Sequence, residues 1–211
     1  YLRRREDGTQ ETPDEMFWRV ANFVAERGYR ARGVTSEDKI REAASKFFDI
    51  MRSLRFLPNS PTLMNAGVEG GQLAACLVLP IEDDMHSIFQ TLHDMAMAAK
   101  QGAGCGYNFS KLRPRGARVK STNGVASGPV SFMGMFNLAT EVVQQGGMRR
   151  GANMGILNVD HPDVMEFITC KDEGGKLSNF NLSVGVTDEF MRAVMEDRDW
   201  TLTHPYSESK T

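Results

Sequence analysis

Apolar residues near the start of the chain recur at intervals of three and four, which is the spacing of amphipathic helices. Thr12 and Glu15 form a capping box with Pro13 at the first helical position, and Ser36 is a second N-cap residue. The stripes that the two helices are predicted to bury are Met16, Val20, Phe23 and Val24, and then Ile40, Ala43, Phe47, Met51 and Leu54. Residues 1–57 are therefore predicted to form an antiparallel helix pair, joined by a turn over residues 28–35.

The pattern changes after Phe56, where short apolar runs begin to alternate with helical stretches. The runs typical of strands are 76–79, 155–159, 182–186 and 201–203, and the predicted helices cover 85–101 and follow Gly128, Asp160 and Thr187. Alternating strands and helices predict an α/β architecture with parallel strands. We assign residues 58–211 to this second part of the chain.

Three loops stand out because they are rich in Gly, Ser, Thr, Asn or Arg. They cover residues 57–71, 110–128 and 144–155. Loops at the strand ends of an α/β sheet are where ligands bind, so these three segments are the predicted binding loops.

Two of these loops concentrate positive charge. The second holds Lys111, Arg113, Arg115, Arg118 and Lys120 with no acidic residue among them, and the third holds Arg149 and Arg150 between glycines. Basic runs like the one at 111–120 occur in phosphate-binding loops, and more often on a plain solvated surface. For Arg149 and Arg150, contact with a ligand and an ordinary loop remain equally open. Residues 102–106 do not complete the dinucleotide-binding pattern G-x-G-x-x-G, because Tyr107 follows Gly106.

Composition excludes several classes of protein. The 211 residues are 41% apolar and 25% charged with a net charge of −2, which argues against disorder, and no apolar run is long enough to cross a membrane. The basic run has no interleaved aromatic residues, which argues against nucleic-acid binding. The three cysteines form no C-x-x-C pair, and the histidines show no ligand spacing, so we expect no metal site and a reducing, cytoplasmic location. A lone cysteine such as Cys76 is more often a small core residue.

Several segments together resemble the large chains of ribonucleotide reductases. They read FLPNSPTLMNAG at 56–67, QLAAC at 72–76, GAGCG at 102–106, GMRRGA at 147–152 and HPD at 161–163. Two more, ACLVLP at 75–80 and VASGPVSFM at 125–133, are most similar to the adenosylcobalamin-dependent class II enzymes. The resemblance implies a helical N-terminal segment followed by about the first half of a ten-stranded α/β barrel.

The resemblance also implies a chemistry, the reduction of ribonucleotides to 2′-deoxyribonucleotides for DNA synthesis. In this family a thiyl radical removes the 3′ hydrogen of the ribose, and the 2′ hydroxyl leaves as water while a cysteine pair becomes a disulfide. Cys76 matches the first member of that pair. The positions that match substrate-binding residues are Ser60, Thr62, Ala75 and Gly104.

A deoxynucleotide effector sets substrate specificity in this family. Asp83 matches the residue that binds the effector's deoxyribose hydroxyl, and Arg113 and Lys120 match residues that hold its phosphates. The specificity loop between effector and substrate matches Gly147, Arg149, Arg150 and Gly151. The implied partners are a ribonucleoside di- or triphosphate, a thioredoxin-type reductant, the remainder of a reductase chain and a second copy; the implied cofactor is adenosylcobalamin, with no binding residues identified.

The printed sequence also departs from the family. It contains no Asn-Pro-Cys-x-Glu segment, which carries the family's radical cysteine, and neither Cys105 nor Cys170 matches a missing cysteine. We therefore expect these residues alone to be inactive and to expose an unpaired sheet edge. Two alternatives stay open, namely a class I large chain, which takes its radical from a metal-containing partner, and a nucleotide-sensing module without chemistry.

Overall fold

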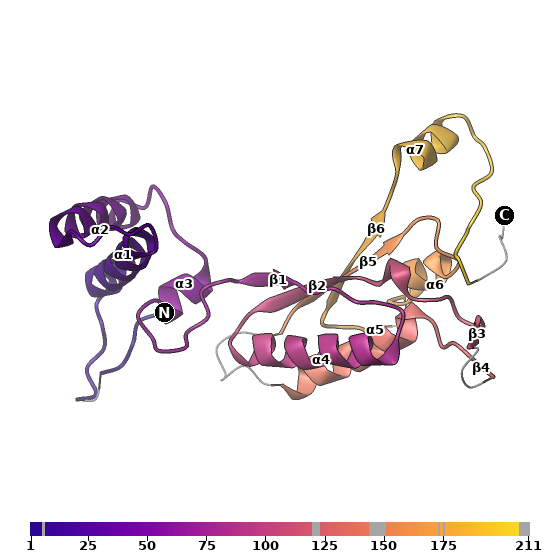
Figure 1. Cartoon of the computed structure of the whole chain (residues 1–211), viewed down its shortest axis with the longest axis horizontal. Coiled ribbons are helices and arrows are strands. Elements are labelled where there is room, and N and C mark those ends of the chain that lie inside the picture. The colour runs from indigo at the N-terminus through magenta and orange to yellow at the C-terminus, as the bar shows by residue number, and fades with distance from the viewer. Residues whose placement is uncertain (6, 120–122, 144–150, 173, 175, 207–211) are drawn as a thin grey trace. The chain divides into compact units, whose positions relative to one another are not determined.

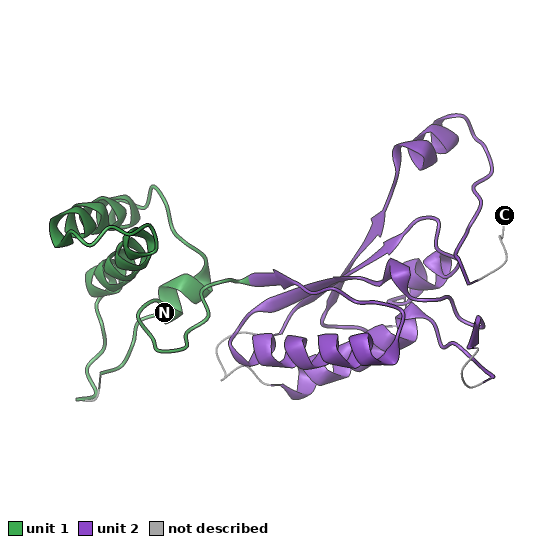
Figure 2. Ribbon diagram, in the orientation of Figure 1, with its two compact units in different colours: residues 1–75 green, residues 76–211 purple. Residues whose placement is uncertain are grey.

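The computed structural model describes residues 1–5, 7–119, 123–143, 151–172, 174 and 176–206 (Figure 1). The chain divides into two compact units, Tyr1–Ala75 and Cys76–Thr211 (Figure 2). Each unit has a hydrophobic core of its own.

The first unit is helical, as predicted. Helix α1 (Pro13–Arg30) begins at the capping box of Thr12 and Glu15, and helix α2 (Glu37–Arg52) begins at the N-cap residue Ser36. The two helices pack along their apolar stripes and bury Met16, Val20, Ile40, Ala43 and Met51. A third helix, α3 (Ser60–Asn65), lies inside the segment predicted to be a loop, because Asn59 caps it by accepting from the Thr62 amide at 2.9 Å.

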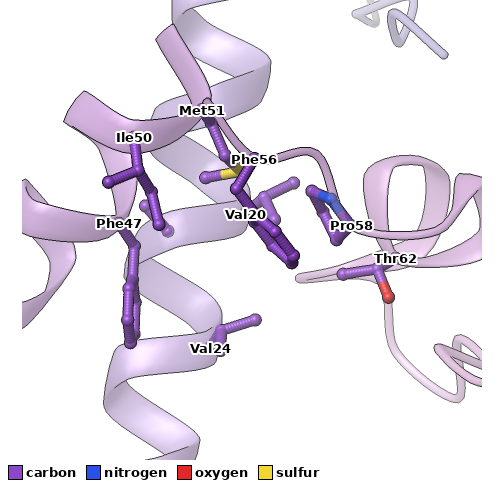
Figure 3. Close-up of a pocket in the computed structure, with 9 residues that line it drawn as sticks. Val20, Val24, Phe47, Ile50, Met51, Phe56, Pro58 and Thr62 are labelled. Atoms are coloured by element: carbon purple, nitrogen blue, oxygen red, sulfur yellow. The ribbon is translucent and has the colours of Figure 1, made fainter. Parts of the chain in front are cut away.

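Some residues of the two apolar stripes are exposed, although the sequence predicts that they are buried. Leu54 is 70% exposed, because α2 ends at Arg52 and Leu54 turns into the left-handed region with φ of 56°. Val24 and Phe47 lie at the edge of the helix interface, where they line an apolar pocket of about 330 Å³ (Figure 3). The pocket is completed by Val20, Ala21, Ile50, Met51, Phe56, Pro58 and Thr62.

One arginine attaches residues 58–75 to the helices. Arg19 of α1 donates to the carbonyl oxygens of Ala66 at 2.7 Å and Leu63 at 3.1 Å, which are backbone acceptors at the end of α3. Its Nε also donates to Glu11 Oε1 at 2.7 Å. The compact units therefore divide at residue 75, whereas the apolar pattern changes at residue 57, because packing and hydrogen bonds hold the intervening segment on the helical unit.

We predict that Glu11→Gln lowers the free energy of unfolding of the helical unit by about 1.5–3 kcal/mol, the value of a hydrogen bond to a charged group. The hydrogen bond from Arg19 lowers the pKa of Glu11, which is the largest effect on this carboxyl group. Because the pKa is lower in the folded state, this stabilisation is present above about pH 4.5 and is lost as the pH falls through the folded pKa.

Urea unfolding of both proteins at neutral and acidic pH measures the difference. The matched control is Glu42→Gln, which breaks an exposed pair with Lys46 and should leave stability nearly unchanged, because solvent screens that pair. Equal losses in the two variants would contradict the role given to Glu11.

The second unit is an α/β structure with a four-stranded parallel sheet in the order β1-β2-β5-β6. The strands are β1 (Cys76–Val78), β2 (Gly104–Asn108), β5 (Asn153–Asn158) and β6 (Phe180–Gly185). The helices are α4 (Met85–Lys100), α5 (Pro129–Val142), α6 (Val164–Thr169) and α7 (Asp188–Met195), with a short 3-10 turn, η1 (Phe109–Lys111), and a two-stranded hairpin of β3 (Arg118–Val119) and β4 (Gly124–Val125). The predicted parallel α/β architecture is confirmed.

Two strand predictions need correction. Strand β2, which pairs with both β1 and β5, was not predicted. Its sequence GCGYN contains two glycines and therefore lacks the apolar run that is typical of a strand. Residues 201–203 form no strand of the sheet; Leu202 is an isolated β-bridge residue, and the Thr203 amide donates to the Asp160 carbonyl oxygen at 2.7 Å.

The core of this unit lies on one face of the sheet. Tyr107 and Phe180 of the strands pack with Met95 of α4 and Phe136 of α5, and the rings of Tyr107 and Phe136 are 4.8 Å apart. Helices α4 and α5 lie together against this face (Figure 1). Gly155 permits the contact, because a Cβ atom there would come within 2.9 Å of the Met133 side chain.

Candidate functional site

The sheet face opposite α4 and α5 carries the predicted redox cysteine. Side chains alternate along a strand, so Leu77 and Cys105 point into the core, whereas Cys76 points to the other face. Cys76 is exposed, and its register partner on the neighbouring strand is Gly104, which has no side chain. Cys76 is thus not a core residue in the described structure.

The other two cysteines lie in different surroundings. Cys105 is buried in the core, and burial raises the pKa of its thiol. Cys170 is half-buried at the end of α6, and burial raises its pKa as well. A raised pKa lowers the fraction of thiolate at neutral pH, so both sulfurs are poor nucleophiles.

We predict that Cys76 is alkylated first when the folded protein is treated with iodoacetamide. Exposure favours its reaction, whereas burial and a raised thiol pKa slow the other two. Peptide mass spectrometry over a time course measures the order. In the Cys76→Ser variant the fast phase should disappear, and labelling of Cys105 at the rate of Cys76 would contradict the assigned sheet faces.

The remaining predicted substrate residues, Ser60, Thr62 and Ala75, belong to the helical unit. Ser60 opens α3, and its hydroxyl lies 3.0 Å from the Tyr1 hydroxyl. The Thr62 hydroxyl donates to the Leu73 carbonyl oxygen at 3.1 Å, which joins α3 to the segment that leads into Ala75. Within its unit, this segment is held in a defined conformation.

A polar cleft of about 660 Å³ lies at the carboxyl edge of the parallel sheet. This edge is where α/β proteins bind their ligands. The cleft is lined by the segments that follow β1, β2 and β5 and by the C-terminal part of the described chain. The lining residues are Glu82, Asp83, Ser110, Lys111, Asn158, Asp160, His161, Thr203, His204, Pro205 and Tyr206.

Two predicted effector residues meet at this cleft. Asp83 accepts from the Arg113 backbone amide at 2.9 Å and from Arg113 Nε at 2.8 Å. The hydrogen bond to Asp83 raises the pKa of the Arg113 guanidinium, which also lies over the Tyr206 ring with 4.6 Å to its centroid. Asp83 and Arg113 are thus a preformed, half-buried pair.

Acidic residues from other segments neutralise much of the basic run. Lys111 pairs with Glu82 and Arg113 with Asp83, both after β1, and Arg115 pairs with Glu166 of α6 at 2.6 Å. The sequence contains no acidic residue within residues 111–120, yet Lys111, Arg113 and Arg115 each have an acidic partner from another segment. These three residues therefore belong to an ion-paired loop rather than to an open basic patch.

Several predicted residues fall outside the described part of the chain. Lys120 and three residues of the specificity loop, Gly147, Arg149 and Arg150, are among them. The fourth, Gly151, is described and lies two residues before β5.

Sequence reasoning missed His161 and the residues 203–206 as parts of the cleft. The HPD segment gave a signal, because it is among the segments that resemble the family, but its role depends on contacts distant in sequence. His204 lies against His161 with 5.2 Å between ring centroids, and burial is the largest effect lowering the pKa of His204. Residues 203–206 have no sequence signal of their own.

Within the part of the chain that the structure describes, no three His, Cys, Asp or Glu side chains are grouped so as to hold a metal ion. Its helices are also too short or too polar to span a bilayer.

Comparison with known protein families identifies the class. Residues 1–71 match the family described as "Ribonucleotide reductase, all-alpha domain", and residues 74–211 match "Ribonucleotide reductase, barrel domain". The chain therefore belongs to the ribonucleotide reductase family, and the partial parallel sheet is part of that family's barrel domain.

Individual members of this family also match the chain, and their names state the type of reductase. The chain is 46% identical to the vitamin B12-dependent ribonucleoside-diphosphate reductase of Thermoplasma acidophilum, over 97% of this chain and 29% of that protein. It is 48% identical to the protein of the same name from Mycobacterium tuberculosis, again over 97% and 29%. It is 31% identical to the ribonucleoside-diphosphate reductase subunit alpha of Helicobacter pylori, over 93% and 24%. The chain thus spans under a third of the length of these relatives.

Proposed function

We propose that this chain carries the first redox cysteine, part of the substrate site and the effector site of a ribonucleotide reductase. The observation that carries the proposal is the exposed Cys76 thiol, which stands on the sheet face opposite α4 and α5, with Gly104 as its register partner. A reducing thiol must touch a bound ribose and later be reached by an external reductant. A thiol sealed in the core could do neither.

The proposed reaction consumes two thiols for each ribonucleotide. A thiyl radical on another cysteine of the protein removes the 3′ hydrogen of the ribose, and the 2′ hydroxyl leaves as water. Cys76 and a second cysteine together provide two electrons and two protons and become a disulfide. The 3′ hydrogen is then returned, which regenerates the radical. A thioredoxin-type protein reduces the disulfide by thiol exchange.

The substrate is proposed to be a ribonucleoside diphosphate, in keeping with the names of the relatives. Ser60 and Thr62 would bind its phosphate or ribose oxygens, and Ala75 and Gly104 would line its path past Cys76. Hydroxyl and backbone groups suit this role, because they can donate hydrogen bonds to anionic oxygens.

Asp83, Arg113 and Lys120 are proposed to bind a deoxynucleotide effector. The paired carboxylate of Asp83 keeps free lone pairs for a deoxyribose hydroxyl, and the guanidinium of Arg113 can bind phosphate. Gly147, Arg149, Arg150 and Gly151 would form the loop that passes the identity of the effector base to the substrate site. Such coupling requires loop conformations that differ in affinity for the substrate bases.

Adenosylcobalamin is the proposed radical source, because two relatives are named as vitamin B12-dependent. The two cavities described above, of about 330 and 660 Å³, have the size of sites for small ligands. We assign the lining residues of neither cavity to binding of the cobalamin ring. A second copy of the chain and the other parts of a reductase are the further proposed partners.

We predict that Cys76→Ser abolishes multiple-turnover reduction in the intact protein and leaves deoxynucleotide binding unchanged. The serine hydroxyl cannot form a disulfide, so the two electrons have no source. Product formation from a labelled ribonucleoside diphosphate with thioredoxin measures turnover, and Cys170→Ser is the matched control that should keep it. Normal turnover in Cys76→Ser would refute the redox role.

We predict that Asp83→Ala weakens deoxynucleotide binding by about ten- to hundredfold, equivalent to one charge-assisted hydrogen bond of about 1.5–3 kcal/mol. Titration calorimetry with a deoxynucleoside triphosphate measures the dissociation constant. Glu82→Ala serves as the control at the same cleft, because it breaks only the exposed pair with Lys111. Equal affinities in wild type and Asp83→Ala would overturn the effector assignment.

The two alternative functions predict different results in the turnover and deoxynucleotide-binding experiments. A class I large chain would need a metal-containing partner subunit for turnover and would not respond to adenosylcobalamin. A nucleotide-sensing module would bind deoxynucleotides but show no turnover in any form, with or without Cys76.

A further inference from the structure

The segment His161-Pro162-Asp163 has no part in the proposed chemistry, yet its two polar side chains point toward the effector loop. It follows β5 and leads into α6. His161 is 2% exposed, which is uncommon for an imidazole. A buried polar side chain needs hydrogen-bond partners, so its contacts show what it holds.

His161 is fixed by hydrogen bonds at both ring nitrogens. Its Nδ1 lies 3.0 Å from the Asp163 backbone amide, which can only donate, so Nδ1 carries no proton. The proton is therefore on Nε2, which donates to the Leu112 carbonyl oxygen at 2.9 Å. The ring connects the end of β5 with the residue that precedes Arg113.

Asp163 holds the same loop from the other side of Arg113. Its Oδ2 accepts from the Arg115 backbone amide at 2.7 Å. Gly128 packs against this junction, because a Cβ atom there would come within 2.8 Å of Asp163 Oδ2, and its φ of +82° also favours glycine. The carboxylate thus sits in a closely packed junction and not on an open surface.

Arg113 therefore lies between two backbone anchors, at Leu112 and Arg115. With its neighbours held, the Arg113 amide and side chain both reach Asp83. We propose that His161 and Asp163 are positioning residues of the effector site, which hold residues 112–115 so that Arg113 stands against Asp83. The inference rests on the proposed function for the identity of the ligand, but the hydrogen bonds that it invokes do not.

Two substitutions of His161 separate its two bonds. The amide nitrogen of glutamine can take the place of Nε2, so His161→Gln keeps a donor for Leu112. The shorter asparagine side chain takes the place of Nδ1, so His161→Asn keeps the bond to Asp163 and loses the one to Leu112. Glu166→Gln is the control, because it touches the same loop only through the exposed Arg115 side chain.

Two measurements on the intact protein test the proposal. Amide hydrogen exchange over residues 112–117 should be about tenfold faster in His161→Asn than in wild type, and near wild type in His161→Gln and Glu166→Gln. The dissociation constants of the four deoxynucleoside triphosphates should rise about tenfold in His161→Asn and be restored in His161→Gln.

The outcomes distinguish the positioning role of His161 from the proposed effector function. Unchanged exchange in His161→Asn would overturn the positioning role, as would equal losses of exchange protection and affinity in both His161 variants, which would show a merely structural histidine. If exchange changes as expected but wild type binds none of the four nucleotides, the positioning role stands and the proposed effector function fails.

Discussion

Parallel pairing of β1, β2 and β5 is the constraint on which the α/β unit depends. Because successive side chains point to opposite faces, the register that places Leu77 beside Cys105 in the core sends Cys76 to the face opposite α4 and α5. Because the strands run in one direction, the segments that follow them gather at one edge. Asp83, Lys111 and His161 meet there although they come from three separate parts of the chain.

Charge at that edge is balanced locally before any ligand arrives. Asp83 and Glu166 neutralise arginines that look unpaired along the sequence, and hydrogen bonds to backbone atoms fix the loop between them. A loop held in this way loses little conformational entropy when it binds an anion, which favours affinity. In the proposed function, this preorganisation would lower the entropic cost of binding a deoxynucleotide.

The helical unit is also held by a charged side chain that bonds backbone carbonyl oxygens. Arg19 uses one guanidinium to satisfy the carbonyl oxygens at the end of α3 and the carboxylate of Glu11. Hydrogen bonds of this kind are costly to break when half-buried, because the partner left behind loses its hydration without compensation. The position of the predicted substrate residues Ser60 and Thr62 within their unit therefore depends on a residue that contacts neither of them directly.

The sequence by itself determined the helix starts at Thr12 and Ser36, the parallel α/β class and the family, since capping, periodicity and motif wording are local properties. It did not show that GCGYN is a strand, that Leu54 is exposed, or that residues 58–75 join the helices. Tertiary structure alone decided which acids pair with the basic run and what His161 holds. Those contacts join residues about 30 to 50 positions apart, and only folding brings such partners within hydrogen-bond distance.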